Sequence, residues 1–492
     1  MLRDGGRALA MMLFTTLAFG LLVAASFLLS AREARSAPRE SAQPPSAVAT
    51  ADTLRFTIDD AVKQATGHNL GVQSSATNIE AANGRVREAM SFALPQINGN
   101  VTYNRQFDSI FREEGSTADS GLVAIFQNSP FGSVHQWNAE LTASQLLWSG
   151  GRVGAGLSAA KAVRRSTQAD LNQTTSDVAL AAQRAYWNAA TAHEVAAIAE
   201  SSLAVARAQL KQVEQLHAQG ARAEYDLLRA QVDAANQEPP VVSTRNFEQI
   251  ALLDFKQVLN LPLEQPVALL SAPGFDDGFA PVLQESAVDG AGRASLSRAE
   301  ADVEARYQLM RVERAGRWPQ LTMQGTMSHQ AFPADGAPEL DQFRRNLSGQ
   351  VKLEFPLFLG GRTFGTVQRA TAEWRQAQIE LERTRQDVSL EVAEAHHEVD
   401  RSLSVLLARR GTARLAIRTY RLAQSRYVNG LATQLEVSDS RVQAATAAVN
   451  EVVAARDYRI SLAALEHAVG RPLTLVPQSL DSMSDSNLDE GR

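Results

Sequence analysis

Residues 147–152 read LWSGGR, and residues 357–362 read LFLGGR. Both stretches begin with apolar side chains and end in Gly-Gly-Arg, and their offset is 362 − 152 = 210. The same offset places Gly220 on Gly430. Anchors that return at one spacing indicate that the chain contains an internal duplication.

Two further pairs extend the repeat. The Leu-Pro-Leu at 261–263 corresponds at the same offset to the Arg-Pro-Leu at 471–473. Upstream, the LPQI at 94–97 corresponds to the WPQL at 318–321, but at an offset of 318 − 94 = 224. The first half therefore carries 14 extra residues before its Gly-Gly-Arg, which we interpret as a longer loop between two strands.

Alternation of apolar and polar residues predicts two strands in each half. The run QINGNVTYNR is typical, since every second residue is polar. The predicted strands lie at about 96–105 and 137–147 in the first half, and at about 320–329 and 346–355 in the second. We expect four strands in all.

Long helices are predicted between the strand pairs. Apolar residues recur at helical intervals through 152–260 and 362–470, and the distance from Gly151 to Gly220, like that from Gly361 to Gly430, is 69 residues. A helix of that length would extend for roughly 100 Å. A returning helix after each glycine gives two very long helical hairpins. Only the first contains Pro239-Pro240, where we expect a break or kink.

The N-terminus is predicted to be an export signal. Arg3 and Arg7 precede an uncharged stretch from Ala8 to Ala31, followed by small residues. A retained membrane anchor is the alternative, because the apolar part is long for a cleaved signal. The predicted organisation is a signal peptide (1–37), a linker (38–55), a first repeat (56–263), an inter-repeat equatorial segment (264–289), a second repeat (290–473) and a disordered tail (474–492).

Composition excludes several classes of protein. The chain has no cysteine, which removes disulfide frameworks, thiolate nucleophiles and lipidation at an N-terminal cysteine. Its formal net charge is −6, so it lacks the positive field that nucleic acid requires, and we expect no nucleic-acid partner. With 45% hydrophobic and 21% charged residues, the chain has the composition of a folded protein.

The strands have the length of membrane-spanning β-strands. Nine or ten residues cross a bilayer when tilted, and Trp137, Trp148 and Trp318 lie at strand ends, where membrane-interface aromatics occur. A soluble α+β protein, in which these tryptophans cap a buried sheet, is the alternative. Four strands cannot close a barrel, so a membrane barrel would have to be shared among subunits.

In this order of motifs the chain resembles the TolC-type outer membrane efflux proteins. The resemblance rests on FTIDDA at 56–61, the Leu-Pro-Gln strand start, the LWSGGR turn and the duplication, and covers about 56–473. It implies a mixed α and β membrane protein, a homotrimer with a shared 12-stranded outer-membrane β-barrel and a periplasmic α-barrel. The implied function is that of a passive exit duct of a tripartite efflux pump or type I secretion system. Its partners would be a periplasmic adaptor (membrane fusion protein), an inner-membrane transporter and outer-membrane lipid in a Gram-negative bacterium.

The resemblance also implies a periplasmic gate. Glu436 and Asp439 match the paired acids of the family's constriction, and their spacing of three puts them on one helical face. Three-fold symmetry would make a ring of six carboxylates. Asp226 is the repeat counterpart of Glu436, and Tyr427 is the first residue of the second tip. The alternative is that these acids are ordinary solvated charges on a helix surface.

The helical tips are the expected contact for the adaptor. The predicted tip residues are Gly220, Ala221, Arg222, Gly430, Leu431, Ala432 and Thr433. A glycine turn between two helices would look alike for structural reasons alone. Some relatives carry an arginine on the second tip, where this chain has Ala432, and its arginine lies on the first tip instead.

An enzyme and a periplasmic scaffold are two alternative classes for this protein. The GxGxxA pattern at 154–159 lacks the βαβ unit of a dinucleotide site. Glu-x-x-His pairs occur at 214–217 and 394–397, as in di-iron bundles, but the repeat register separates them by 30 residues, or about 45 Å. We therefore expect no enzyme, no metal and no cofactor. A periplasmic coiled-coil scaffold or adaptor stays open as the second function.

Overall fold

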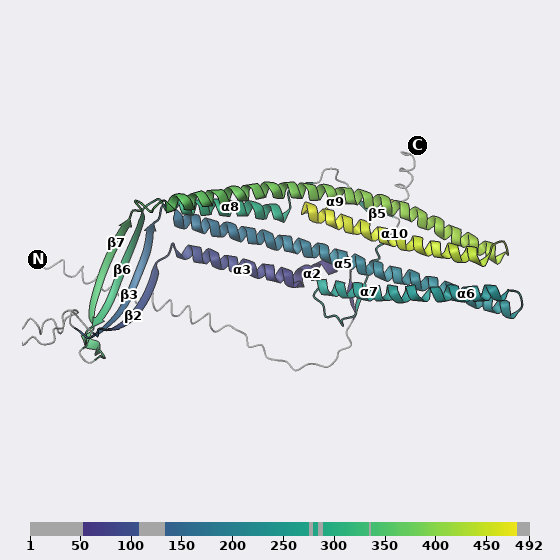
Figure 1. Ribbon diagram of the computed structural model, residues 1–492, viewed down its shortest axis with the longest axis horizontal. Coiled ribbons are helices and arrows are strands. Elements are labelled where there is room, and N and C mark those ends of the chain that lie inside the picture. Colours follow the sequence, from purple (N-terminus) through teal and green to yellow (C-terminus); the bar gives the residue numbers. More distant parts are fainter. Residues whose placement is uncertain (1–52, 108–132, 275–278, 284–288, 334–335, 480–492) are drawn as a thin grey trace, which may run out of the picture. The chain divides into compact units, whose positions relative to one another are not determined.

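The computed structural model describes residues 53–107, 133–274, 279–283, 289–333 and 336–479 (Figure 1). The predicted signal peptide, the linker up to residue 52, most of the longer first loop and the end of the tail lie outside these residues. Within them, no helix is both long enough and apolar enough to span a membrane.

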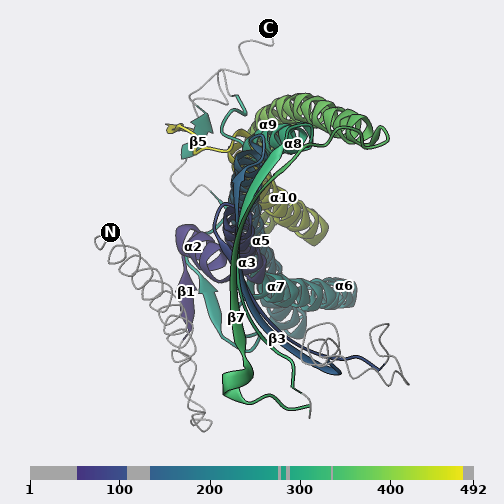
Figure 2. The same cartoon turned by 90° about the vertical axis from the view of Figure 1, so that its left-hand side faces the viewer.

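The four predicted strands form one antiparallel sheet in the order β2-β3-β6-β7. Their bounds are β2 (Gln96–Arg105), β3 (His135–Trp148), β6 (Gln320–Ala331) and β7 (Arg344–Glu354). The two strands of the first half thus pair with the two of the second through β3 and β6. Figure 2 shows that these strands curve along their length. β3, β6 and β7 each extend two residues further than predicted at the end away from the helices.

Two helices of 67 residues lead out of this sheet, α5 (Arg152–Ala218) and α9 (Arg362–Val428). Each begins after a glycine in the left-handed region, Gly151 with φ +84° and Gly361 with φ +82°, which turns the chain sharply out of the strand. No proline interrupts either helix. Small side chains such as Ala182 and Ala189 are buried along α5, so that neighbouring helices approach closely.

The return path differs between the repeats. In the second repeat a single helix, α10 (Gln434–Val469), runs back along α9. In the first, α6 (Glu224–Asn236) ends and α7 (Glu238–Val258) begins around Gln237. The break predicted at Pro239-Pro240 is confirmed. Both prolines lie in the first turn of α7, where a residue without an N–H group removes no hydrogen bond of the helix.

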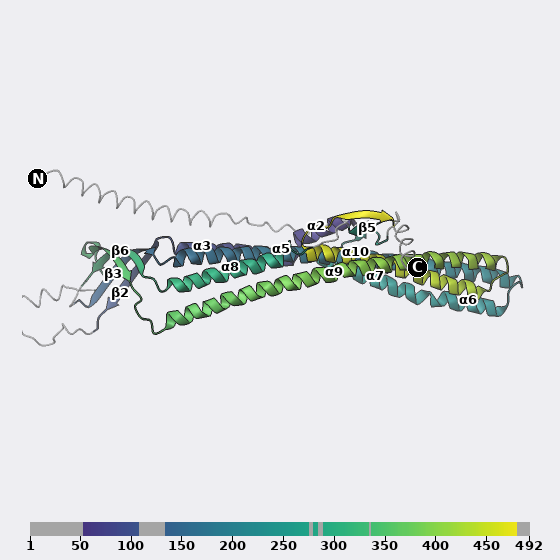
Figure 3. The same ribbon diagram turned by 90° about the horizontal axis from the view of Figure 1, so that it is seen from above.

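Three shorter helices complete the bundle. They are α2 (Ile58–His68), α3 (Leu70–Ser91) and α8 (Ala294–Ala315). α3 and α8 lead into β2 and β6 and pack along α5, as Figure 3 shows from above. A short 3₁₀ turn, η1 (Leu340–Gln342), precedes β7.

The expectation of four strands in all is wrong, because the described residues also contain two small two-stranded sheets. β1 (Leu54–Phe56) pairs in parallel with β4 (Val267–Leu269), and β5 (Phe279–Leu283) pairs antiparallel with β8 (Leu475–Ser479). The end of the predicted linker and the start of the predicted disordered tail are therefore strands. Each strand has only three to five residues, and its partner lies about 200 positions away, so no local periodicity marks it.

Each repeat has its own core beside these small sheets. In the first repeat Tyr186 packs edge to face against Trp187 and Phe255, with ring centroids 5.1 and 5.9 Å apart. In the second, Tyr458 and Leu465 of α10 are fully buried against α9. These two cores fix the helices at mid-length, between the sheet and the tips (Figure 1).

Candidate functional site

The two helical tips are built by the same turn. Gly220 and Gly430 both have φ +73°, a conformation that side chains with a Cβ rarely adopt. In each tip the residue after the glycine donates its N–H to the carbonyl five positions earlier, at 2.8 Å. This is the Schellman arrangement that ends a helix and satisfies its free carbonyl groups. The predicted tip residues therefore lie in two equivalent loops, each joining one long helix to its return helix.

Glu436 has a structural role that was not predicted. Its carboxylate accepts hydrogen bonds from the N–H and the hydroxyl of Thr433, at 3.3 and 3.2 Å, while the Thr433 hydroxyl accepts from the Glu436 N–H at 3.3 Å. This capping box begins α10, whereas α6 begins at Ala223 without a side-chain cap. The Thr-x-x-Glu spacing is visible in the sequence and carried this signal.

The other predicted gate acids lie close to the tips. Asp439 is exposed, one turn of α10 beyond Glu436, and accepts a hydrogen bond from Gln443 at 2.9 Å. Glu436 is also exposed, so both carboxylates of the second tip lie on one accessible side of α10. Asp226, in the first turn of α6, is half-buried.

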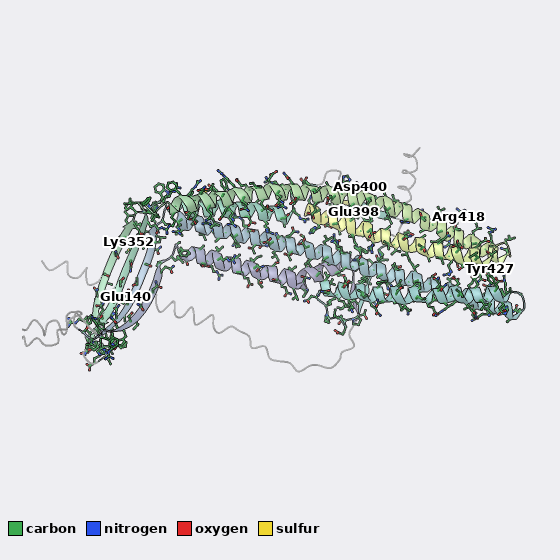
Figure 4. The ribbon with its side chains drawn as sticks, in the orientation of Figure 1. Glu140, Lys352, Glu398, Asp400, Arg418 and Tyr427 are labelled. Atoms are coloured by element: carbon green, nitrogen blue, oxygen red, sulfur yellow. The ribbon has the colours of Figure 1, made fainter. Side chains whose placement is uncertain are left out.

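Tyr427 and Arg222 bring the two tips together. The Arg222 guanidinium carbon lies 5.0 Å from the centroid of the Tyr427 ring, a cation–π distance. Tyr427 is only 6% exposed, although it is the next-to-last residue of α9 (Figure 4). The arginine on the first tip thus contacts the second repeat of the same chain.

A buried ion pair just behind the tips was not predicted. Arg441 of α10 donates two hydrogen bonds to the carboxylate of Asp233 on α6, at 2.8 and 3.0 Å. It also donates to the hydroxyl and the carbonyl of Ser202 on α5, at 2.6 and 3.2 Å. The Ser202 hydroxyl in turn donates to Gln237, the residue at the break between α6 and α7. No local pattern could have found this network, because its members are far apart in the chain.

The pKa values of two carboxyl groups in α10 are raised by burial. Loss of solvent raises the pKa of Glu451, an effect that Arg410 and Arg414 oppose, and loss of solvent alone raises that of Glu466. Burial also raises the pKa of Tyr458 to about 12, with a further contribution from Asp400. All three lie well away from the tips.

The strand register divides the four-stranded sheet into a polar and an apolar face. The row Asn100–Glu140–Ser328–Asn346 is polar, and the adjoining row Gly99–Leu141–Met327–Leu347 is apolar. Glu140 and Lys352, both on the polar face, are labelled in Figure 4. A register shift near Leu147 returns Trp148 to the apolar face.

The three predicted interface tryptophans lie at both ends of the sheet. Trp148 and Trp318 are exposed at the end next to the helices, with ring centroids 6.4 Å apart. Trp137 lies near the opposite end and donates its indole N–H to the carbonyl of Gly336 at 2.8 Å. In the described part of the chain, no group of three or more His, Asp or Glu side chains is arranged to hold a metal ion.

The chain belongs to the outer membrane efflux protein family. The family model matches residues 61–260 and 291–471, one match for each repeat. The family resemblance deduced from the sequence motifs is thereby confirmed.

Several solved structures share the fold. CusC is 17% identical, with a TM-score of 0.70 over 89% of this chain and 97% of its own. The outer membrane protein VceC of Vibrio cholerae is 17% identical, with a TM-score of 0.65 over 84% of this chain and 96% of its own. The Campylobacter jejuni CmeC outer membrane channel is 16% identical, with a TM-score of 0.69 over 92% of this chain and 93% of its own. No curated protein sequence gives a significant match.

Proposed function

We propose that the chain is one of three identical subunits of a passive exit duct in the outer membrane. The observation that carries the proposal is the four-stranded sheet, which has one apolar and one polar face and two open edges. β2 and β7 are the edge strands, and within the described residues no further strand pairs with either. Lipid does not tolerate open sheet edges, so a membrane-inserted sheet of this kind must close against other copies.

Strand direction is compatible with such closure. The four strands alternate in direction, so β7 of one copy and β2 of the next would meet antiparallel, as the other neighbours do. Three copies would give an even-numbered barrel of 12 strands. The expectation of three copies of the chain rests on the family resemblance. The polar face would line the lumen, and the apolar face would contact lipid.

The height of the apolar face fits a bilayer. Leu321, paired with Trp148, and Ala331, paired with Trp137, mark the two tryptophan rows and are ten residues apart on β6. At about 3.3 Å per residue this spans about 33 Å along the strand, or about 25 Å along the membrane normal at a tilt of about 40°. An apolar band of about 25 Å is typical of outer-membrane barrels.

The helical tips would form the gate at the periplasmic end. Under three-fold symmetry Glu436 and Asp439 would contribute six carboxylates to one ring, which would favour cations and narrow the pore. Asp226 and Tyr427 would belong to the same gate, and the contact of Arg222 with Tyr427 would hold the two tips together. The glycine turns at 220 and 430 would dock a periplasmic adaptor. The duct would serve a tripartite efflux pump or a type I secretion system, energised by an inner-membrane transporter.

Single-channel current through the purified protein in a planar bilayer tests the proposal. The informative variant is Glu436→Gln with Asp439→Asn, because glutamine at the third helical position can keep the capping box while the charge is removed. We expect a small cation-preferring current in the wild type and a weaker cation preference in the variant. Thr433→Ala is the matched control, since it removes the cap and keeps both charges.

Each outcome separates the parts of the proposal. An unchanged current in the double variant would leave the duct and refute the gate assignment. The same change in Thr433→Ala as in the double variant would assign the effect to the helix start rather than to the carboxylates. Failure of the folded protein to insert at all would favour the periplasmic scaffold.

A further inference from the structure

The apolar face of the four-stranded sheet carries basic side chains at one end only. This is the end away from the helices, where β2 and β6 finish and β3 and β7 begin. The register pairs Arg105 with His135, and His329 with Arg345. Because side chains alternate along a strand, all four share the face of Val101, which belongs to the row of His329. We call these four residues the basic belt.

The charge on this face has one sign. Among the described strand residues of the apolar face none is acidic, whereas Glu140 and Glu354 lie on the polar face. Arg105 and Arg345 are exposed. The described strand residues of this face thus combine an apolar surface with positive charge at one end.

Aromatic rings mark the depth of the basic belt. The Tyr103 hydroxyl and the His135 Nδ1 are 2.7 Å apart, and the Tyr103 ring lies 4.7 Å from that of Trp137. Rings with one polar and one apolar part lie at the level of lipid headgroups. An arginine facing hydrocarbon is costly at mid-membrane, but the cost falls to about 0–1 kcal/mol near the interface. The Tyr103–Trp137 row lies between the two basic pairs: Arg105 and His135 are two residues beyond it, and His329 and Arg345 are two residues before it. The long arginine side chains of both pairs can therefore extend to the headgroups.

We infer that the basic belt binds the phosphate groups of a phosphorylated glycolipid of the outer leaflet, the lipid A class. This inference rests on the proposed barrel, which turns the apolar face toward lipid. Planar guanidinium groups bind phosphate oxygens in pairs, and two arginines with two histidines match a headgroup carrying two phosphates. Other copies of the chain would pair at the strand edges, which leaves this face to lipid.

The test measures lipid binding by the full-length protein in nanodiscs of phosphatidylcholine. Native mass spectrometry follows the binding of bisphosphorylated lipid A and of the same lipid without phosphates. We expect the wild type to prefer the phosphorylated form, and Arg105→Gln with Arg345→Gln to bind it about thirtyfold more weakly. Arg344→Gln is the matched control, because Arg344 precedes Arg345 in β7 but lies on the polar face, and it should bind as the wild type does.

The outcomes distinguish this inference from the proposed function. A wild type that inserts and conducts but binds both lipids equally would refute the basic belt and leave the duct intact. An equal loss in Arg344→Gln would show a general charge effect and would also refute it. A protein that does not enter the nanodiscs would refute both.

Discussion

The Arg441 network provides the sharpest test of how the two hairpins are held together. Arg441 is 6% exposed and Asp233 21% exposed, and the pair joins α10 to α6. Replacing Arg441 by methionine keeps the apolar stem but removes four hydrogen bonds and leaves the carboxylate without its partner. Breaking one side of a buried ion pair costs about 3–5 kcal/mol. Because Asp233 keeps some contact with water, we take the lower end, about 3 kcal/mol.

Hydrogen exchange measures this cost locally. A loss of about 3 kcal/mol should speed exchange of amides in α6 and in the tip half of α10 by about 100-fold, since 1.4 kcal/mol corresponds to a factor of ten. Adding Asp233→Leu to Arg441→Met should restore most of the protection, because no buried charge is then left unpaired. Arg418→Met on the exposed surface of α9 is the control. Equal exchange in Arg441→Met and Arg418→Met would refute the view that this pair fastens α10 to the first hairpin.

Two further changes test the turns and the core. Gly150→Ala should reduce recovery of folded protein far more than Gly360→Ala. Both glycines have φ near +60°, a conformation that destabilises an alanine by about 1–2 kcal/mol. Only a Cβ at position 150 would also lie 2.5 Å from the Cβ of Trp318, and this clash adds about 1–3 kcal/mol to the cost. Equal recovery of the two variants would contradict this packing. Burial raises the pKa of Glu466, so the stability that this group contributes is fully present below its ordinary pKa of 4.5 and is lost as pH rises through the folded-state pKa. Glu466→Gln should therefore raise the melting temperature at pH 8 and leave it unchanged at pH 4, and a destabilised variant at pH 8 would contradict this.

Much of the fold was predictable from the sequence because its rules are local. Alternation predicted β2 within the same bounds that the structure gives, Gln96–Arg105, since a strand with one wet face repeats every two residues. The absence of proline predicted α5 and α9, and Pro239-Pro240 predicted the break before α7. Duplication and motif order were sufficient to indicate the family, which the family model confirms.

The candidate site was predictable only in part. The tip glycines follow from the sequence, because the end of a long helix requires a residue with positive φ. The capping role of Glu436 was also readable from its spacing to Thr433, although it was missed. The predicted strand ends were sufficient to place the three tryptophans at the two ends of the sheet. The register between neighbouring strands was not predictable in this way, because it is fixed by strand pairing.

Contacts between the repeats were decided by the tertiary structure alone. Arg222 stacks on Tyr427, and Arg441 pairs with Asp233, across about 200 positions of sequence in each case. The strands β5 and β8 pair over a similar distance. Local patterns define which residues a helix or strand buries, but they do not define which distant residue it meets. That choice depends on how the two repeats pack against each other, since a buried charge or an open strand edge is stable only when packing brings its partner to it.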